Sequence, residues 1–271
     1  MTDSKRFLIA AAMVAAPLTA VSAAAQARPD RDGAVARLEQ AAGGRLEVSR
    51  APGEGPVRFL SVTGGPGIAV AGASAEERAR TFLGAYGDAF GLEAGEELLL
   101  VQRPETDEVG MEHVRMQQTH QGVPITGAEL IVHLRGGRVL GANGKSLPDL
   151  GNVDMTPRIG PDRALEVARG LVLRKYGEGE VTLSTPRLEL LDVPLLGGPP
   201  RPRGLAWFVE TSRLDMREFV WVEARRGFPM LHFSQLPLRD IIDPHVLHGG
   251  ASLPTETHSR RTLELYIGGD S

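Results

Sequence analysis

The chain has 271 residues, of which 42% are hydrophobic, 24% charged and 5% aromatic, and it contains 33 glycines and 19 prolines. This composition is ordinary for a globular protein, and the length allows one large domain or two small ones. The net charge of -4 excludes a protein that binds nucleic acid mainly through its charge, and the absence of cysteine excludes disulfides, a thiolate nucleophile and cysteine-bound metal sites.

Residues 1–27 have the pattern of a secretory signal peptide. Lys5 and Arg6 form a basic start, residues 7–21 are mostly apolar, and Ala25-Gln26-Ala27 has the small-residue spacing of a cleavage site. The apolar run is shorter than the about 20 residues of a membrane span, so an uncleaved anchor fits less well. We expect a secreted or periplasmic protein without membrane attachment after cleavage, and an exported fold that lacks disulfides suits a bacterial route.

The next part of the chain is expected to form a helix followed by antiparallel strands. In residues 28–73 we expect a linker, a short helix over about 33–42 and a strand over 57–62. Ser74 to Glu77 form a capping box that predicts the start of a second helix, and Gly91 predicts its end. Alternation and turn residues then predict strands over 97–103, 111–119, 128–135 and 139–142.

A second unit repeats this order over residues 151–236. Pro161 predicts the first turn of a helix and Gly177 its end. Strands are expected over 187–193, 205–211, 218–224 and 228–233. Two consecutive units, each a helix packed on an antiparallel sheet, indicate the α+β class. Residues 237–271 show little periodicity and are expected to form a tail, in which 263–267 are compatible with one last strand.

No constellation of residues in the sequence supports catalysis by this chain. A zinc hydrolase needs His-Glu-x-x-His on a helix, and none of the seven histidines has that arrangement. His245 and His248 are three residues apart and could share a metal, but their proline and glycine neighbours are not typical of a helix. A P-loop and a serine-nucleophile elbow are also missing. We therefore expect no catalytic residue, no metal and no cofactor.

A long motif occupies the strand region of the first unit. Residues 112–133 read EHVRMQQTHQGVPITGAELIVH, and residues 137–144 read GRVLGANG. This order resembles the fungalysin/thermolysin propeptide (FTP) motif, in which an H-x-R-x-x-Q strand, a G-V-P-V-x-G turn, a strand ending in V-H and a G-x-V-x-x-x-N-G turn follow one another. The resemblance covers about residues 74–146, and we expect an FTP-like domain over 74–150. The motif residues are His113, Arg115, Gln118, Gly122, Pro124, Gly127, His133, Asn143 and Gly144.

Several motif residues carry local expectations that do not depend on the family. Gly122 and Gly127 are expected at the positive φ values of a strand corner, with Pro124 fixing the turn between them. Gln117 and Gln118 point to opposite faces of a strand, so one of them faces inward and needs hydrogen-bond partners. His133 alternates with apolar neighbours and is expected on the strand surface or hydrogen-bonded in the core.

The second unit resembles the PepSY-type domain that follows the FTP motif in protease proregions. The resemblance depends on residues 161–176, 205–209 and 221–227, and Glu223 and Arg226 depart from the family's V-D-A-x-T-G pattern. Residues 261–269 weakly resemble the link from a proregion to a catalytic domain.

Together these resemblances imply a secreted, non-catalytic protein that assists the folding of a thermolysin-like zinc metalloprotease and masks its active cleft. The protease domain would be a partner either in cis, in a longer precursor, or in trans. The alternative is a secreted binding or scaffold module without a protease partner. A third interpretation, a metalloenzyme, is opposed by the missing His-Glu-x-x-His sequence.

Overall fold

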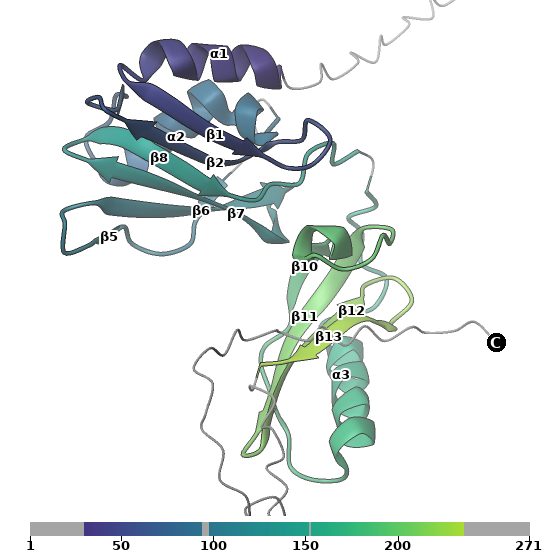
Figure 1. The fold of residues 1–271 in the computed structure, drawn as a ribbon. Helices are drawn as coiled ribbons and strands as arrows, with labels where there is room; N and C mark the ends of the chain where they lie inside the picture. Colours follow the sequence, from purple (N-terminus) through teal and green to yellow (C-terminus); the bar gives the residue numbers. More distant parts are fainter. Residues whose placement is uncertain (1–29, 94–97, 152, 236–271) are drawn as a thin grey trace, which may run out of the picture.

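The computed structural model describes residues 30–93, 98–151 and 153–235, so the predicted signal peptide, His245, His248 and the predicted tail lie outside the described residues. Within these ranges the helices are α1 (Arg31–Ala41), α2 (Ala75–Tyr86), η1 (Gly87–Phe90), α3 (Pro161–Tyr176) and η2 (Val193–Leu196), where η marks a 3-10 helix. The predicted α+β class is confirmed, with two units of helix and sheet (Figure 1). None of the helices in the described ranges has the length and hydropathy of a membrane-spanning segment.

The first unit is an antiparallel sheet in the order β1-β2-β8-β7-β6, with short strands at its margins. β4 and β5 extend it beyond β6, and β3 pairs with β8. These strands are β1 (Arg45–Arg50), β2 (Val57–Thr63), β3 (Ile68–Ala69), β4 (Leu98–Leu100), β5 (Glu105–Thr106), β6 (Glu112–His120), β7 (Val123–Arg135) and β8 (Arg138–Gly144).

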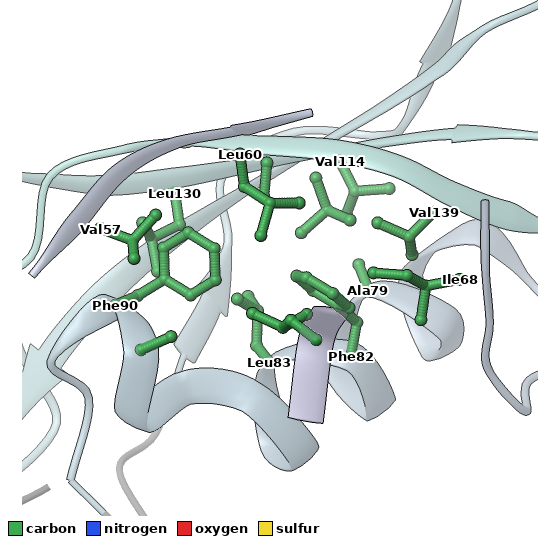
Figure 2. Packing of buried hydrophobic residues seen from close by; sticks show 14 of the residues in the cluster. Val57, Leu60, Ile68, Ala79, Phe82, Leu83, Phe90, Val114, Leu130 and Val139 are labelled. Atoms are coloured by element: carbon green, nitrogen blue, oxygen red, sulfur yellow. The ribbon is translucent and has the colours of Figure 1, made fainter. Parts of the chain in front are cut away.

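One face of this sheet is covered by α1, α2 and η1, and the core of the unit lies between the two layers. In Figure 2, Phe82 of α2 and Phe90 of η1 point toward Leu60, Val114 and other strand residues. Phe82 and Phe90 are fully buried, and their rings meet edge to face with centroids 6.1 Å apart. Helix α1 and strand β1 add to this core, so residues from both 28–73 and 74–150 form one hydrophobic cluster. Strand β1 was not predicted from the sequence.

The second unit packs α3 against the antiparallel strands β10-β11-β12-β13, and β9 pairs with the far end of β11. Apolar residues of α3 and the facing sides of β11 and β12 are buried together. Pro161 at the first turn and Gly177 at φ +81 mark the helix ends as predicted. The strands are β9 (Thr182–Leu183), β10 (Arg187–Leu191), β11 (Gly204–Arg213), β12 (Met216–Glu223) and β13 (Pro229–Ser234).

The two sheets are joined, which the sequence did not predict. Strand β10 of the second unit pairs in parallel with the first residues of β7, where Leu190 lies opposite Ile125. The strand order therefore runs without a break from β1 to β13. Strand β7 has 13 residues because it crosses from one unit to the other, whereas the sequence pattern predicted a strand from Ala128.

The capping box at α2 gives a direct test of this local chemistry. The Ser74 side chain accepts a hydrogen bond from the Glu77 N–H, and Glu77 accepts one in return from the Ala73 N–H. We expect Ser74→Ala to lower the free energy of unfolding by about 1 kcal/mol, because one helix-end N–H loses its partner. Urea denaturation measures the change, with Ser49→Ala on the exposed face of β1 as the control. Equal stability of both variants would show that the cap is dispensable.

Candidate functional site: the motif strands and the junction of the two units

The outer face of β6 and β7, opposite the helices, carries a row of hydrogen-bonded side chains from the motif. His113 and His133 lie directly opposite each other, and their Nδ1 atoms are 2.7 Å apart. Nε2 of His133 contacts the Asn143 side chain on β8, and Nε2 of His113 lies 3.2 Å from Oδ2 of Asp107. Three predicted motif residues are thus brought together, with His133 partly buried and hydrogen-bonded.

Asp107 is the member of this row that sequence reasoning missed. Its Oδ1 accepts hydrogen bonds from the backbone N–H groups of Val109 and Met111, which shapes the turn between β5 and β6. The Met111 bond, together with the hydrogen bonds from His113 and Val109, lowers the pKa of the exposed Asp107 below its ordinary value. An aspartate followed by a glycine-containing turn before a strand was the available signal, since such residues cap turns.

Arg115 is the next outward residue of β6, and it forms a surface ion pair. Its guanidinium donates to Glu129 of β7 at 2.7 Å, with both side chains partly exposed. Gln117, two residues further, donates to the backbone oxygens of Ile125 and Ala128. Exposed pairs of this kind contribute little to stability, so these side chains chiefly define the polar character of the face.

Gln118 is the inward-facing member of the glutamine pair, and it is fully buried. Its amide donates to the Leu147 carbonyl at 3.0 Å and accepts from the Leu147 N–H at 2.8 Å. These bonds hold the segment that leaves β8 against the first unit. Gly144 has φ +146, and a Cβ there would lie 2.0 Å from the Glu129 carbonyl oxygen. Both residues therefore build the exit from the first sheet.

The G-V-P-x-x-G part of the motif lies at the junction, but not as the corner that was predicted. Gly122 and Gly127 have φ values of +78 and +75, as expected. The turn, however, is Gln121-Gly122, and Pro124 lies inside β7 opposite Thr119. The prediction that Pro124 fixes a turn is wrong, because the chain continues as an extended strand that pairs with β6 on one side and β10 on the other.

Glu189 of β10 connects the two units at this junction. Its carboxylate accepts hydrogen bonds from the Thr126 hydroxyl of β7 and from the Trp221 indole of β12, both at 2.8 Å. Arg187 donates to the other carboxylate oxygen at 2.6 Å. Glu189 is only 6% exposed, so a charge-paired carboxylate is enclosed between the units. Such a group is strongly held only when all of its partners are present.

Apolar packing and a second polar contact reinforce the junction. Lys145, just after β8, donates to the Leu195 carbonyl of η2 at 3.1 Å. The cluster behind these contacts draws on both units and consists of Ile125, Ala128, Leu147, Leu150, Leu190 and Leu195. The second unit is thereby fixed against the first along β7 and the segment after β8.

A cleft of about 820 Å³ opens beside the junction, between the segment after β8 and the loop before β11. Two of its three arginines face aspartates. Arg203 lies 3.4 Å from Asp192, and Arg225 lies 3.6 Å from Asp154. Arg201 and Asp149 also line the cleft, so its formal charges cancel and select neither an anionic nor a cationic ligand.

The second unit contains a buried ionic cluster around Glu218 on β12. The carboxylate is fully buried and accepts hydrogen bonds from Lys175 at 2.9 Å, from His232 at 3.1 Å and from the Tyr176 hydroxyl. Burial by itself would raise the pKa of Glu218, but these three donors outweigh it and lower the pKa to about 2. The cluster ties the end of α3 to β12 and β13.

The pKa values of Lys175 and Tyr176, two of the groups that donate to Glu218, are shifted upward. Burial favours the neutral amine, but the hydrogen bond and the charge of Glu218 outweigh it and raise the pKa of Lys175. Burial and the same carboxylate raise the pKa of the Tyr176 hydroxyl. Lys175 and Glu218 therefore stay charged at neutral pH, and their role here is structural.

The described ranges contain no group of three or more histidine, aspartate or glutamate side chains placed to hold a metal ion. The motif residues instead line the polar outer face of β6 and β7, hold the segment after β8 against the first unit and form part of the junction between the units.

Comparisons with known proteins agree with part of the sequence interpretation. Residues 99–146 match the family model of the Fungalysin/Thermolysin Propeptide Motif. The predicted resemblance is confirmed for this segment, which contains most of β4, all of β5 to β8 and all nine motif residues named above. The match starts later than the predicted 74–146 and does not include α2. No curated protein matches the chain.

Among solved structures, the C-terminal domain of Bacillus megaterium YpeB resembles the chain with 13% sequence identity and a TM-score of 0.37. The match covers 76% of this chain and 98% of that domain. The PepSY-type resemblance of the second unit therefore stays a prediction from its sequence.

The structure of the junction predicts that valine lowers the stability of the protein by different amounts at Gly122 and Gly127, although both glycines have the same backbone conformation. A Cβ on Gly127 would lie 2.5 Å from Cδ2 of Leu196, whereas a Cβ on Gly122 would meet no atom within 4 Å. We expect Gly122→Val to cost only the strain of positive φ, about 1–2 kcal/mol. Gly127→Val adds overpacking and should lower the free energy of unfolding by about 2–5 kcal/mol.

Chemical denaturation of the full chain measures both changes. Adding Leu196→Ala to Gly127→Val removes the clash and should recover part of the loss, beyond the cost of Leu196→Ala alone. Equal losses at the two glycines, with no recovery, would show that β7 does not approach η2 as described.

The Glu218 cluster predicts a pH dependence of stability. Because its pKa falls from 4.5 to about 2 on folding, ionised Glu218 stabilises the protein fully above about pH 4.5, and this contribution is lost as the pH falls toward 2. The contribution is on the order of 3 kcal/mol. We expect Glu218→Gln to be less stable than the unmodified chain at pH 7, with a gap that narrows in acid.

Thermal or urea unfolding between pH 7 and pH 2.5 measures this gap. The matched control is Glu166→Gln, which alters an exposed pair with Arg163 on α3. A gap that stays constant over the whole pH range would contradict the lowered pKa of Glu218.

Proposed function

We propose that this chain is a secreted, non-catalytic proregion-like protein that assists the folding of a thermolysin-like zinc metalloprotease and inhibits it. The observation that carries this proposal is the match of residues 99–146 to the Fungalysin/Thermolysin Propeptide Motif. Proteins of this propeptide class act on a protease domain, in cis within a precursor or in trans. The protease is therefore the proposed partner, and nucleic acid and membranes are not.

The junction supports a role in which a preformed surface meets the partner. Glu189 links Thr126 and Trp221, so the two units present their surfaces in a fixed relation. A rigid binding surface loses little conformational entropy on association. The polar outer face of β6 and β7 and the sheet of the second unit are then available together.

Strand β13 supports an extended contact near the end of the described residues. It pairs with β12 on one side, and no other described strand pairs with its second edge. A strand at the edge of a sheet can pair with an extended segment of a partner, while alternate side chains fill its pockets. We propose that the partner contact involves this edge and the residues that follow it.

Export is part of the proposal. The basic start, the apolar run and Ala25-Gln26-Ala27 support a signal peptide cleaved after Ala27, which would place the chain in the periplasm or outside the cell. A partner protease would have to be exported by the same cell.

Inhibition of such a protease tests the proposal. We expect the full chain to inhibit a thermolysin-like protease exported by the same cell. A chain ending at residue 235 should inhibit at least tenfold more weakly, because residues 236–271 are proposed to cross the active cleft. Its melting temperature should change little, because the residues of the described cores lie before residue 235.

Equal inhibition by both chains would assign the contact to the folded units. No inhibition by either chain, and no binding to any exported protease of the cell, would contradict the proposal and favour a scaffold module. A stably folded point variant on the exposed face, Ser49→Ala, serves as the control for full inhibition.

A further inference from the structure

The histidine pair on the outer face of the first sheet has a limited capacity for protons. With the Nδ1 atoms of His113 and His133 only 2.7 Å apart, one Nδ1 must carry a hydrogen and the other must be bare. Two imidazolium rings would each carry a hydrogen on Nδ1, so this arrangement cannot hold both. The folded pair therefore takes up at most three ring protons, whereas the same two histidines in the unfolded chain take up four in acid.

The partners of the two Nε2 atoms decide how many ring protons the folded pair can hold. Nε2 of His113 faces the Asp107 carboxylate and needs a hydrogen to bond with it. Nε2 of His133 meets Oδ1 of Asn143, and rotation of the amide by half a turn would present its nitrogen instead. When the amide accepts, the pair holds three protons and one positive charge, which Asp107 favours on His113. When the amide donates, the pair holds two protons and both rings are neutral. A fourth proton fits neither case.

The charges around the pair balance one cation, not two. Asp107 is the one carboxylate in hydrogen-bond contact with a ring nitrogen of the pair in the described ranges. On the other side, Gly141 of β8 lies opposite His133 and Ser61 of β2 lies opposite Gly141. The first charged residue in that row is Glu47 of β1, which pairs with Arg45. The remaining charged groups that face the pair are Glu105 opposite His113 on β5, Arg115 on β6 with its partner Glu129 on β7, and Arg135 on β7.

We propose that the His113–His133 pair is an acid-sensitive latch between β6 and β7. The two rings stay in contact while the pair carries two or three ring protons, and the latch opens when a fourth proton binds. Opening separates the rings, breaks the contact with Asp107 and loosens the turn between β5 and β6. This latch is independent of the proposed protease partner, since it depends only on contacts within the first sheet.

The direction of the pH effect follows from the proton count. In acid the folded pair binds one proton fewer than the unfolded chain, so stability falls as the pH falls through the range in which histidines gain protons. The unfolding equilibrium constant should rise by up to tenfold for each pH unit because of this pair alone.

Nuclear magnetic resonance of the full chain tests the proton count directly. The nitrogen chemical shifts of the two rings report which nitrogens carry hydrogen between pH 8 and pH 4.5. We expect one Nδ1 to stay bare for as long as the rings remain in contact, and amide exchange in β6 and β7 to accelerate when it becomes protonated. Two fully protonated rings that stay in contact in the folded protein would overturn the proposal.

A matched pair of variants tests the effect on stability. His113→Asn offers an amide that can donate to Nδ1 of His133 or, after rotation, accept from it, so His133 can become a cation without losing this contact. His120→Asn makes the same change at the end of β6, away from the pair. Between pH 6.5 and pH 5, the unfolding constant of the wild type and of His120→Asn should rise by up to tenfold per pH unit more than that of His113→Asn.

The same pH slope in all three proteins would overturn the latch. If His113→Asn does not fold, the ring titration of the unmodified chain still decides the question.

Discussion

Strand β7 belongs to both units, and most of the structure depends on this shared strand. Its C-terminal half pairs with β6 and β8 in the first sheet, and its first residues pair with β10 of the second. To run through the junction, the strand needs the positive φ of Gly127, where a side chain would strike Leu196. The buried Glu189 of β10 stabilises this crossing by accepting hydrogen bonds from Thr126 of β7 and from Trp221 of β12. Both sheets are fixed by this one stretch of backbone.

Local chemistry made much of the fold predictable from the sequence. The capping box at Ser74, the stop at Gly91, Pro161 at a helix start and the hairpin at Gly136-Gly137 are signals carried by a few neighbouring residues. Strand alternation also predicted that one of Gln117 and Gln118 faces inward, and the structure shows that it is Gln118, whose partner Leu147 lies 29 positions away. The helix ends and the hairpin depend on contacts within a few positions along the chain.

Long-range contacts were not predicted from the sequence, because neighbouring residues along the chain do not specify them. The pairing of β10 with β7 joins residues 65 positions apart, and no local pattern specifies it. The register of β6 against β7 shifts between Gln117 and Thr119, so alternation alone could not place His113 opposite His133. The partners of Glu189 come from three strands, and Asp107 reaches the histidines from a turn.

The two units place their ionisable groups differently. In the second unit, Glu218 is held by three donors and ties α3 to the sheet, so its charge serves the fold. In the first unit, the histidine row lies on the open face of the propeptide motif, partly accessible to solvent. Acid is therefore expected to act on the two units through different groups, Glu218 in the second unit and the proposed histidine latch in the first.

Calorimetric titration of the full chain into the folded catalytic domain of a thermolysin-like protease from the same cell tests the central claim most directly. The account predicts saturable one-to-one binding that a small zinc-directed inhibitor of the active site displaces. Absence of binding to every such protease of that cell, with the chain shown to be folded in the same buffer, would contradict it.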